Sequence, residues 1–272
     1  MKPIGVFDSG VGGLTVVRAL RRRLPWESIL YLGDTARLPY GTKSAATVRR
    51  YTRTNIEFLE ERGVKAVVVA CNTASALALP ENTGEDEDDP GARPLAAVPV
   101  WGVVEPGAER AAAVSKGRVG VIATESTVAS DAYGRALRRR RPGLEVVSRA
   151  CPLFVPLVEE GWQDDPIAEQ VAMRYLEPLA AARIDTLVLG CTHYLLLRPV
   201  LERVLGPGVA LVDSAEAVAE AAARGLGAAG LLAADGAPPA HHFCVTDSGE
   251  RFARIARQIL GGPVSFELVE VH

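Results

Sequence analysis

The chain has 272 residues, of which 48% are hydrophobic and 23% charged. This composition is typical of a globular protein and excludes a disordered chain, a collagen-like repeat and a coiled coil. The formal net charge is −3, from 30 Lys and Arg against 33 Asp and Glu. Because no overall positive field attracts nucleic acid or an anionic membrane surface, we expect a small-molecule partner and neither nucleic acid nor membrane.

The N-terminal residues carry no pattern of a targeting sequence. Met1, Lys2 and Pro3 lead directly into the apolar residues 4–7, without a leader that is first charged and then apolar and without a small-residue cleavage site. No run of about 18 apolar residues follows. We therefore expect a cytoplasmic protein.

Short apolar runs alternate with helical patterns, as in a parallel sheet covered by helices. Strands are predicted, in chain order, at 4–7, 28–32, 66–70, 98–104, 118–123, 144–148, 186–190, 210–212 and 243–245. Helices are predicted at 13–23, 42–61, 128–140, 165–181, 214–223 and 249–260. Residues 67–69 and 187–189 consist only of Val and Leu, as expected of strands buried on both faces.

The two halves of the chain resemble each other. Residues 4–9 are echoed by 119–124, each followed by a helical segment that ends in three arginines, and residues 64–73 are echoed by 184–193. This internal similarity indicates a duplication. The alternative is that any two strand-to-helix units share some identical residues by chance.

The predicted fold class is α/β, with two similar, open, mainly parallel-sheet domains related by pseudo-twofold symmetry. The first domain is expected to comprise residues 1–97 together with 211–272, and the second residues 98–210. Open parallel sheets bind ligands at the carboxyl ends of their strands, so the active site is expected in the cleft between the domains.

Four cysteines, Cys71, Cys151, Cys191 and Cys244, lie far apart without a CxxC pair. This spacing excludes zinc fingers, zinc ribbons and thioredoxin motifs, and we expect no metal site. Cys71 and Cys191 end predicted strands at matching positions of the two halves, so we predict that their thiols face each other across the cleft. The alternative is two buried structural cysteines, which is our interpretation of Cys151 and Cys244.

Short polar residues follow both matched cysteines, Asn72-Thr73 after Cys71 and Thr192-His193 after Cys191. Such residues cap a helix and direct backbone N–H groups towards the strand end. A helix N-terminus favours a substrate carboxylate and a thiolate, so we expect the thiol pKa to lie below its ordinary value. Ordinary helix caps are the alternative.

Further polar groups follow other predicted strands. Asp8 and Ser9 precede the glycine-rich turn 10–13, whose glycine spacing does not fit the GxGxxG pattern of a dinucleotide site. Three roles are open for Asp8: it caps a helix, it receives a substrate ammonium group, or it tunes a thiol. Tyr40-Gly41 forms either a turn that presents backbone groups to a carboxylate or a plain loop. Thr124 occupies the position of Ser9 in the second half and is a candidate for binding substrate.

Two side chains are candidates for assisting the thiols. His193 is within reach of the same pocket as Cys191 and suits proton transfer, although a lone histidine is often structural. Glu159 is a candidate supporting acid, with a plain surface glutamate as the alternative. The acidic run 85–89 lies in a stretch from 80 to 94 that contains Pro and Gly, and it is expected to be a solvated loop.

These motifs together resemble the glutamate racemase family. Residues 8–14, 40–41, 70–74 and 190–194 carry the resemblance, in order and across nearly the whole chain. The sequence departs from the family pattern in the longer acidic stretch after Leu79 and in Leu195, where the family often has proline.

The resemblance implies cofactor-independent interconversion of L- and D-glutamate, which supplies D-glutamate for peptidoglycan. It implies that Cys71 takes the Cα proton from D-glutamate and Cys191 from L-glutamate, with auxiliary roles for Asp8, Glu159 and His193. It also implies a homodimer. Substrate contacts are implied for Asp8, Ser9, Tyr40, Gly41, Asn72, Thr73, Thr192 and His193.

The chemistry of racemisation suits two matched thiols, because the proton leaves one face of Cα and a proton arrives on the other. Two alternatives stay open. One is an aspartate or hydantoin racemase of the same superfamily, and the other is a two-domain amino-acid sensor that binds in the cleft without turnover.

Overall fold

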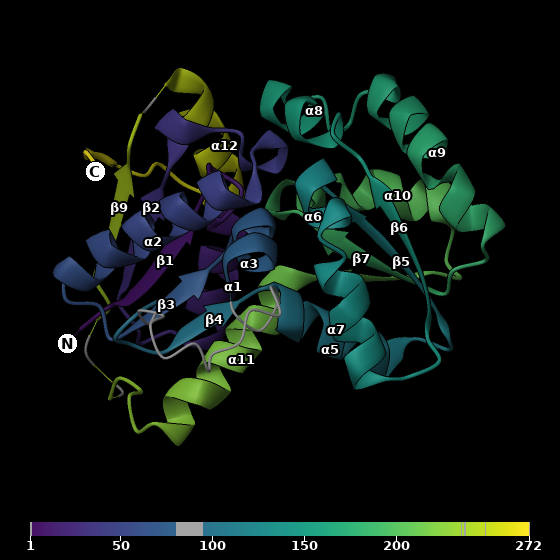
Figure 1. Cartoon of the computed structure of the whole chain (residues 1–272). Helices are drawn as coiled ribbons and strands as arrows, with labels where there is room; N and C mark the ends of the chain where they lie inside the picture. The colour runs from purple at the N-terminus through teal and green to yellow at the C-terminus, as the bar shows by residue number, and fades with distance from the viewer. Residues whose placement is uncertain (1, 80–94, 235, 237, 248, 272) are drawn as a thin grey trace.

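A computed structural model describes residues 2–79, 95–234, 236, 238–247 and 249–271. The chain forms two α/β halves side by side, each built on a parallel sheet (Figure 1). The acidic run 85–89 lies outside the described residues. None of the helices in the described part is both long enough and apolar enough to cross a membrane.

The first half is built on a six-stranded sheet with the order β10-β9-β2-β1-β3-β4, in which every pairing is parallel. Its strands are β1 (Ile4–Asp8), β2 (Ile29–Gly33), β3 (Ala66–Val69), β4 (Val100–Gly102), β9 (His241–Val245) and β10 (Glu267–Leu268). The four residues of β3 are all buried, as their Ala and Val side chains predict.

The second half is built on a four-stranded parallel sheet with the order β6-β5-β7-β8. Its strands are β5 (Arg118–Ala123), β6 (Glu145–Ala150), β7 (Thr186–Gly190) and β8 (Ala210–Asp213). This order repeats the β2-β1-β3-β4 core of the first sheet. The predicted fold class, with two similar parallel-sheet halves, is confirmed.

Helices cover both faces of each sheet. In the first half α1 (Leu14–Arg23), α11 (Ser214–Ala228) and α12 (Glu250–Leu260) pack on one face, and α2 (Ala45–Glu61) and α3 (Asn72–Ala78) on the other. In the second half α8 (Phe154–Glu160), α9 (Pro166–Ala181) and α10 (Arg198–Leu205) cover one face, and α5 (Val104–Val114) and α7 (Ala132–Arg140) the other. Successive strand residues point to opposite faces, so Val188 packs with α5 and α7 whereas Leu187 and Leu189 pack with α8 and α9.

One helix predicted as continuous is divided into two helices in the structure. Residues 128–140 were expected as a single helix, but α6 (Glu125–Ala129) ends before α7 begins. Asp131 between them has a left-handed backbone, with φ of 51°, which interrupts a right-handed helix. The Ser130 hydroxyl donates to the Thr127 carbonyl and accepts from the Ala132 N–H, so side-chain hydrogen bonds replace helical ones at the break.

The helix predicted at 42–61 begins later than expected. A 3₁₀ turn, η2 (Tyr40–Thr42), comes first, and α2 starts at Ala45 because the Ser44 hydroxyl accepts from the Thr47 N–H as an N-cap. A second short 3₁₀ helix, η1 (Thr35–Arg37), follows β2.

The domain limits at 97/98 and 210/211 stay a prediction. Pairing places β4 in the first sheet and β8 in the second. The chain then returns through α11, which packs against α1 of the first half and α5 of the second.

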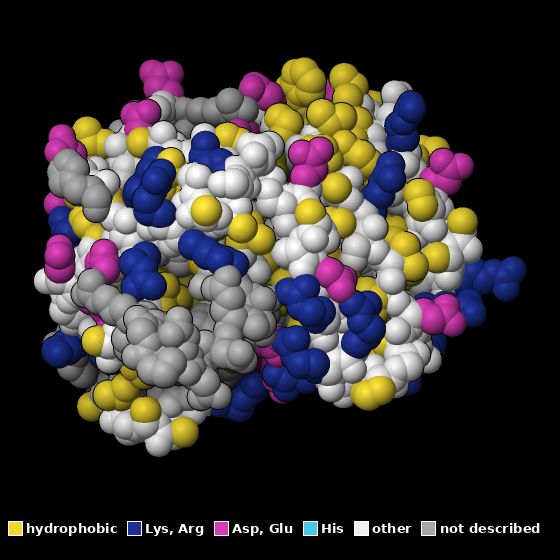
Figure 2. Space-filling model, viewed as in Figure 1, with side chains coloured by type: hydrophobic (Ala, Val, Ile, Leu, Met, Phe, Trp, Pro, Cys, Tyr) yellow, Lys and Arg dark blue, Asp and Glu magenta, His cyan; other side chains and the backbone are white. Residues whose placement is uncertain are grey.

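The visible surface carries one cluster of apolar side chains and one cluster of basic side chains in the second half (Figure 2). Hydrophobic side chains gather over α8 and α9, where Leu153, Trp162 and Ile167 are exposed. Arginines gather over α7, whose last turn carries Arg138, Arg139 and Arg140. Cations near a helix C-terminus complement the helix dipole.

The two faces of α9 predict different responses to truncation. Leu176 is 1% exposed and Met173 is 57% exposed on the same helix. We expect Leu176→Ala to lower the free energy of unfolding by about 2–5 kcal/mol, because it leaves a cavity in the core. Met173→Ala should change it by less than about 0.5 kcal/mol. Urea unfolding followed by circular dichroism measures both values, and equal losses would contradict the assigned helix face.

Candidate active site

The residues that follow β1, β3, β5 and β7 meet around one cavity of about 350 Å³ between the two halves. This volume is at the lower end of the range for small-molecule sites, about 300–1,000 Å³. Every predicted site residue except Asp8 lines the cavity. These residues are Ser9, Tyr40, Gly41, Cys71, Asn72, Thr73, Thr124, Glu159, Cys191, Thr192 and His193.

Both matched cysteines reach this cavity, one from each half. All four cysteines are free and buried. Cys151 follows β6 and Cys244 lies in β9, and neither lines the cavity. The cavity therefore brings together the two thiols that the internal repeat pairs.

Cys71 occupies the N-cap of α3. Its sulfur accepts from the Ala74 N–H at 3.5 Å and donates to the Ser9 hydroxyl at 3.6 Å. Burial raises the pKa of the Cys71 thiol to about 12, the negative charge of Asp8 adds to this rise, and the Ala74 and Ser9 hydrogen bonds oppose it. The expectation of a lowered pKa is therefore wrong for Cys71, because the cost of burying a thiolate exceeds the help from the helix N-terminus.

Cys191 has a different neighbourhood. It follows β7 and precedes the 3₁₀ helix η3 (Thr192–Leu197). Its sulfur lies 3.9 Å from Nδ1 of His193, and Nε2 of the same ring lies 3.5 Å from a carboxylate oxygen of Glu159 on α8. The contact to Glu159 has the distance of an ion pair, although Nε2 lacks hydrogen-bond geometry.

The charge of His193 depends on these two neighbours. Burial alone would lower the pKa of His193, but the contacts to Cys191 and Glu159 and the negative charge of Asp8 raise it to about 10. At neutral pH the ring is therefore an imidazolium, so a positive charge lies beside the Cys191 sulfur. The two thiols of the cavity thus differ in the charge next to them.

Asp8 lies behind the wall of the cavity. It is 1% exposed, and one of its carboxylate oxygens accepts from the Gly10 and Gly13 N–H groups at 3.0 Å each. Burial raises the pKa of Asp8, against the lowering effects of His193 and of the turn N–H groups. Of the roles proposed for Asp8 from the sequence, this position favours shaping the turn and tuning the thiol of Cys71 over contact with the substrate.

Threonine hydroxyls join the two halves at the edge of the cavity. Thr73 of α3 lies 3.0 Å from Thr124 and 3.2 Å from Thr127 of the second half, measured between hydroxyl oxygens. The Ser126 hydroxyl donates to the Gly41 carbonyl at 2.8 Å. A Cβ on Gly41 would lie 2.7 Å from Cβ of Thr124, so the two loops meet only because position 41 has no side chain.

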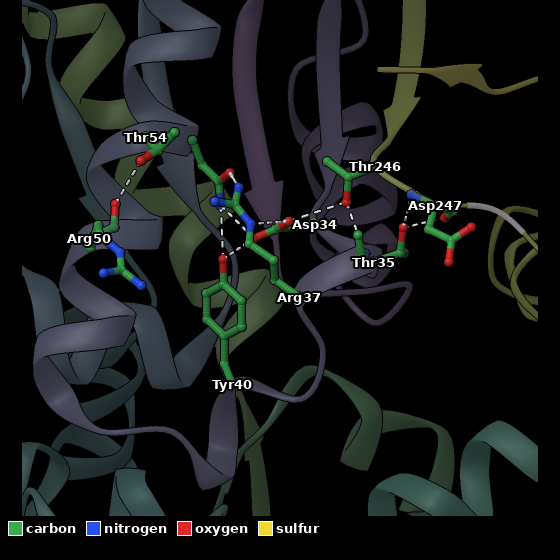
Figure 3. A network of polar contacts seen from close by, with 10 residues as sticks. Asp34, Thr35, Arg37, Tyr40, Arg50, Thr54, Thr246 and Asp247 are labelled. Atoms are coloured by element: carbon green, nitrogen blue, oxygen red, sulfur yellow. Dashed lines mark hydrogen bonds and ion pairs between the residues drawn. The ribbon is translucent and has the colours of Figure 1, made fainter. Parts of the chain in front are cut away.

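The Tyr40 hydroxyl belongs to a polar network that the sequence analysis missed. Figure 3 shows the Tyr40 hydroxyl directed at the carboxylate of Asp34, to which it donates a hydrogen bond. The same carboxylate accepts from Nε of Arg37 at 2.8 Å and from the Thr246 hydroxyl at 3.2 Å. Asn55 donates to the Tyr40 oxygen at 3.0 Å. The network fixes the loop that carries Gly41. The one sequence signal for it was the position of Asp34, directly after β2.

Other lining residues were also missed. Val155 and Pro156 come from α8, which no apolar period predicted, and Pro152 precedes that helix. Glu125 follows Thr124 at the start of α6. These residues were not recognised because their position in the cavity depends on how the two halves pack.

A family model, curated sequences and solved structures all show similarity of this chain to racemases. A family model described as Asp/Glu/Hydantoin racemase matches residues 13–222. A curated glutamate racemase of Geobacter metallireducens is 51% identical over 262 residues, covering 96% of this chain and 93% of its own length.

Two solved structures are similar over almost their whole length. A glutamate racemase isoform from Bacillus anthracis superimposes with a TM-score of 0.90 at 41% identity, covering 99% of this chain and 97% of that one. A glutamate racemase from Francisella tularensis, solved in complex with D-glutamate, gives a TM-score of 0.89 at 37% identity with the same two coverages of 99% and 97%.

The charge of His193 predicts a measurable titration. An unfolded histidine has a pKa of about 6.5 and the folded value is about 10, so the bound proton stabilises the fold fully below about pH 6.5. This contribution disappears as pH rises through about 10. We expect NMR titration to show the His193 ring charged at pH 8, while burial holds the pKa of His241 below 6.5.

Glu159→Gln should lower the pKa of His193 and reduce the loss of stability between pH 6.5 and 10 in urea unfolding. Glu160→Gln changes the adjacent, exposed glutamate of α8 and is the matched control. A neutral His193 in the wild-type protein at pH 8 would contradict the charge assignment.

Proposed function

The chain belongs to the Asp/Glu/Hydantoin racemase family, within its glutamate racemases, and on this premise we propose that it interconverts L- and D-glutamate by proton transfer at Cα, with Cys71 and Cys191 as the two acid/base groups. It is thus an isomerase. The observation that carries the mechanism is the placement of two free thiols, from equivalent strand ends of two similar halves, in the lining of one cavity.

The forward step uses the difference between the two thiols. With L-glutamate bound, the Cys191 thiolate beside the His193 imidazolium takes the Cα proton and becomes a thiol. The Cys71 thiol, kept protonated by its raised pKa, gives its proton to the opposite face of Cα and becomes a thiolate. The product is D-glutamate, the net charge is unchanged, and the reverse reaction uses the same groups in exchanged roles.

The weak acidity of the Cα proton is the main chemical difficulty. Negative charge builds up on the substrate carboxylate as the proton leaves, and hydrogen-bond donors already in place lower the barrier. Asn72, Thr73 and Thr192 are buried polar residues of the lining and are the donors we assign to this task. Burial in a cavity closed by both halves strengthens each of these interactions.

We propose that the reaction needs no cofactor. Pyridoxal chemistry requires a lysine for the Schiff base, and none of the described residues that line the cavity is a lysine. Two acid/base groups suffice for the proton transfers.

The location of the enzyme and the use of its product are also part of the proposal. We propose a cytoplasmic enzyme that supplies D-glutamate for peptidoglycan, as the resemblance to the family implies. The proposed form is a homodimer, and the exposed apolar side chains Leu153, Trp162 and Ile167 are a surface that association would cover.

The mechanism is tested with L-glutamate in deuterated water. We expect deuterium at Cα of the D-glutamate formed and none at first in the remaining L-glutamate, because different groups take and give the proton. Cys71→Ala and Cys191→Ala should each lower kcat in both directions by at least about 100-fold. NMR gives the exchange and circular dichroism gives the racemisation.

Cys244→Ala is the matched control, because this thiol is buried in β9 outside the cavity. Undiminished racemisation in either active-site variant would refute the two-thiol mechanism. Tight glutamate binding without exchange would favour the amino-acid sensor, and early deuterium in the L-glutamate pool would indicate a single base.

A substrate panel separates the remaining alternatives within the superfamily. We expect kcat/KM for L-glutamate to exceed that for L-aspartate by at least about tenfold, since one methylene changes transition-state binding by about 1–3 kcal/mol. Faster turnover of L-aspartate or of a hydantoin would replace glutamate as the substrate while keeping the two-thiol chemistry.

A further inference from the structure

A hydrogen bond across the cleft joins Tyr133 to Asn72. Tyr133 lies in α7 of the second half and Asn72 begins α3 of the first. The Tyr133 hydroxyl donates to Oδ1 of Asn72 at 2.6 Å, and each residue is only 2% exposed. A short hydrogen bond between buried groups has a strong effect on orientation, because neither group can exchange its partner for bulk water.

The other end of the Asn72 amide has no partner. Its Nδ2 is buried without a hydrogen bond to any of the described residues, while Asn72 lines the cavity. A buried amide nitrogen with two unused donors costs free energy unless a ligand accepts from it. The carboxylate of an amino acid is such an acceptor.

The shape of an amide does not decide which end faces the cavity, because its oxygen and nitrogen occupy nearly the same space. With Oδ1 facing the cavity, the side chain would repel a carboxylate. In the structure the Tyr133 hydroxyl donates to Oδ1, which leaves Nδ2 as the end of the amide that is free to donate to a ligand.

The Tyr133 ring is itself held in place. A Cβ on Gly190 would lie 3.1 Å from the ring and a Cβ on Gly107 would lie 3.3 Å from it. Ser214, at the start of α11, hydrogen-bonds to the hydroxyl. Segments from β7, α5 and α11 thus fix the position of the group that orients Asn72.

We propose that Tyr133 is a positioning residue, which acts through Asn72 to direct two amide donors at the carboxylate of the substrate. The inference rests on the proposed function, because it assigns glutamate as the ligand. Tyr133 does not line the cavity, so its effect is transmitted through the amide. Because the two residues belong to different halves, the donor is oriented only while the halves are together.

The test is Tyr133→Phe, which removes one oxygen and leaves the ring packing unchanged. We expect KM for L- and for D-glutamate to rise about tenfold, the equivalent of one buried hydrogen bond, with a smaller fall in kcat. Tyr175→Phe makes the same change in the second half at a hydroxyl that accepts from the Leu153 N–H, and it should leave KM unchanged.

A double-mutant cycle separates positioning from general stability. If Tyr133 acts through Asn72, Tyr133→Phe should add less than twofold to the loss of kcat/KM already caused by Asn72→Ala. Full additivity, or an unchanged KM in Tyr133→Phe, would overturn the proposal. Thermal unfolding checks that each variant folds.

If Tyr133→Phe is too unstable for kinetics, Ser214→Ala keeps the phenol and removes one of its fixing contacts. It should raise KM in the same direction by a smaller factor, and an unchanged KM would then overturn the proposal. A wild-type chain that binds glutamate without racemising it would refute the proposed function alone. In that case the role of Tyr133 is decided by the rise in unfolding temperature that D-glutamate causes. This rise should be smaller in Tyr133→Phe than in the wild-type protein, and an equal rise would overturn the proposal.

Discussion

The backbone of Gly12 lies directly against Thr192 and His193 of the other half, and the site depends on this close approach. A Cβ at position 12 would lie 2.2 Å from the Thr192 hydroxyl and 2.8 Å from the His193 ring, distances that no side chain can occupy. Gly41 meets Thr124 in the same way. Two parallel sheets whose strand ends face each other would otherwise be held apart by their own loops. Glycine in the facing turns lets one cavity receive a thiol from each sheet.

The backbone repeats itself across this cavity, but the charges do not. Cys71 lies near the buried carboxylate of Asp8, and Cys191 lies near the imidazolium of His193. A duplicated fold alone would provide two equivalent sulfurs. In the proposed mechanism these unequal neighbours suit one acid and one base, which are the two groups that proton exchange at one carbon requires. The symmetry of the fold therefore places two thiols in one cavity, whereas its departures from symmetry place different charges beside them.

Much of this arrangement could be predicted from the sequence. Continuous Val and Leu runs marked the buried strands, and the repeated segments around Cys71 and Cys191 indicated two similar sheets with a thiol at each strand end. What the sequence could not show depends on packing between distant segments. The raised pKa of Cys71 follows from its burial beside Asp8, and the Asp34 network joins side chains from η1, η2, α2 and the segment after β9. The break between α6 and α7 depends on a left-handed Asp131 that no apolar period reveals.

The position of β9 in the first sheet has a consequence for the order in which the molecule is assembled. Residues 241–245 pair along the whole of β2, register for register from Ile29 to Gly33, and β2 is otherwise the outer strand of that side. During synthesis the complete second half leaves the ribosome before this partner does. Until then β2, with the sequence Ile-Leu-Tyr-Leu-Gly, is an apolar edge strand with unpaired backbone groups on one side, and such edges favour incorrect association of chains. Residues 241–245 therefore cover this edge of the first sheet only after the whole second half has been synthesised.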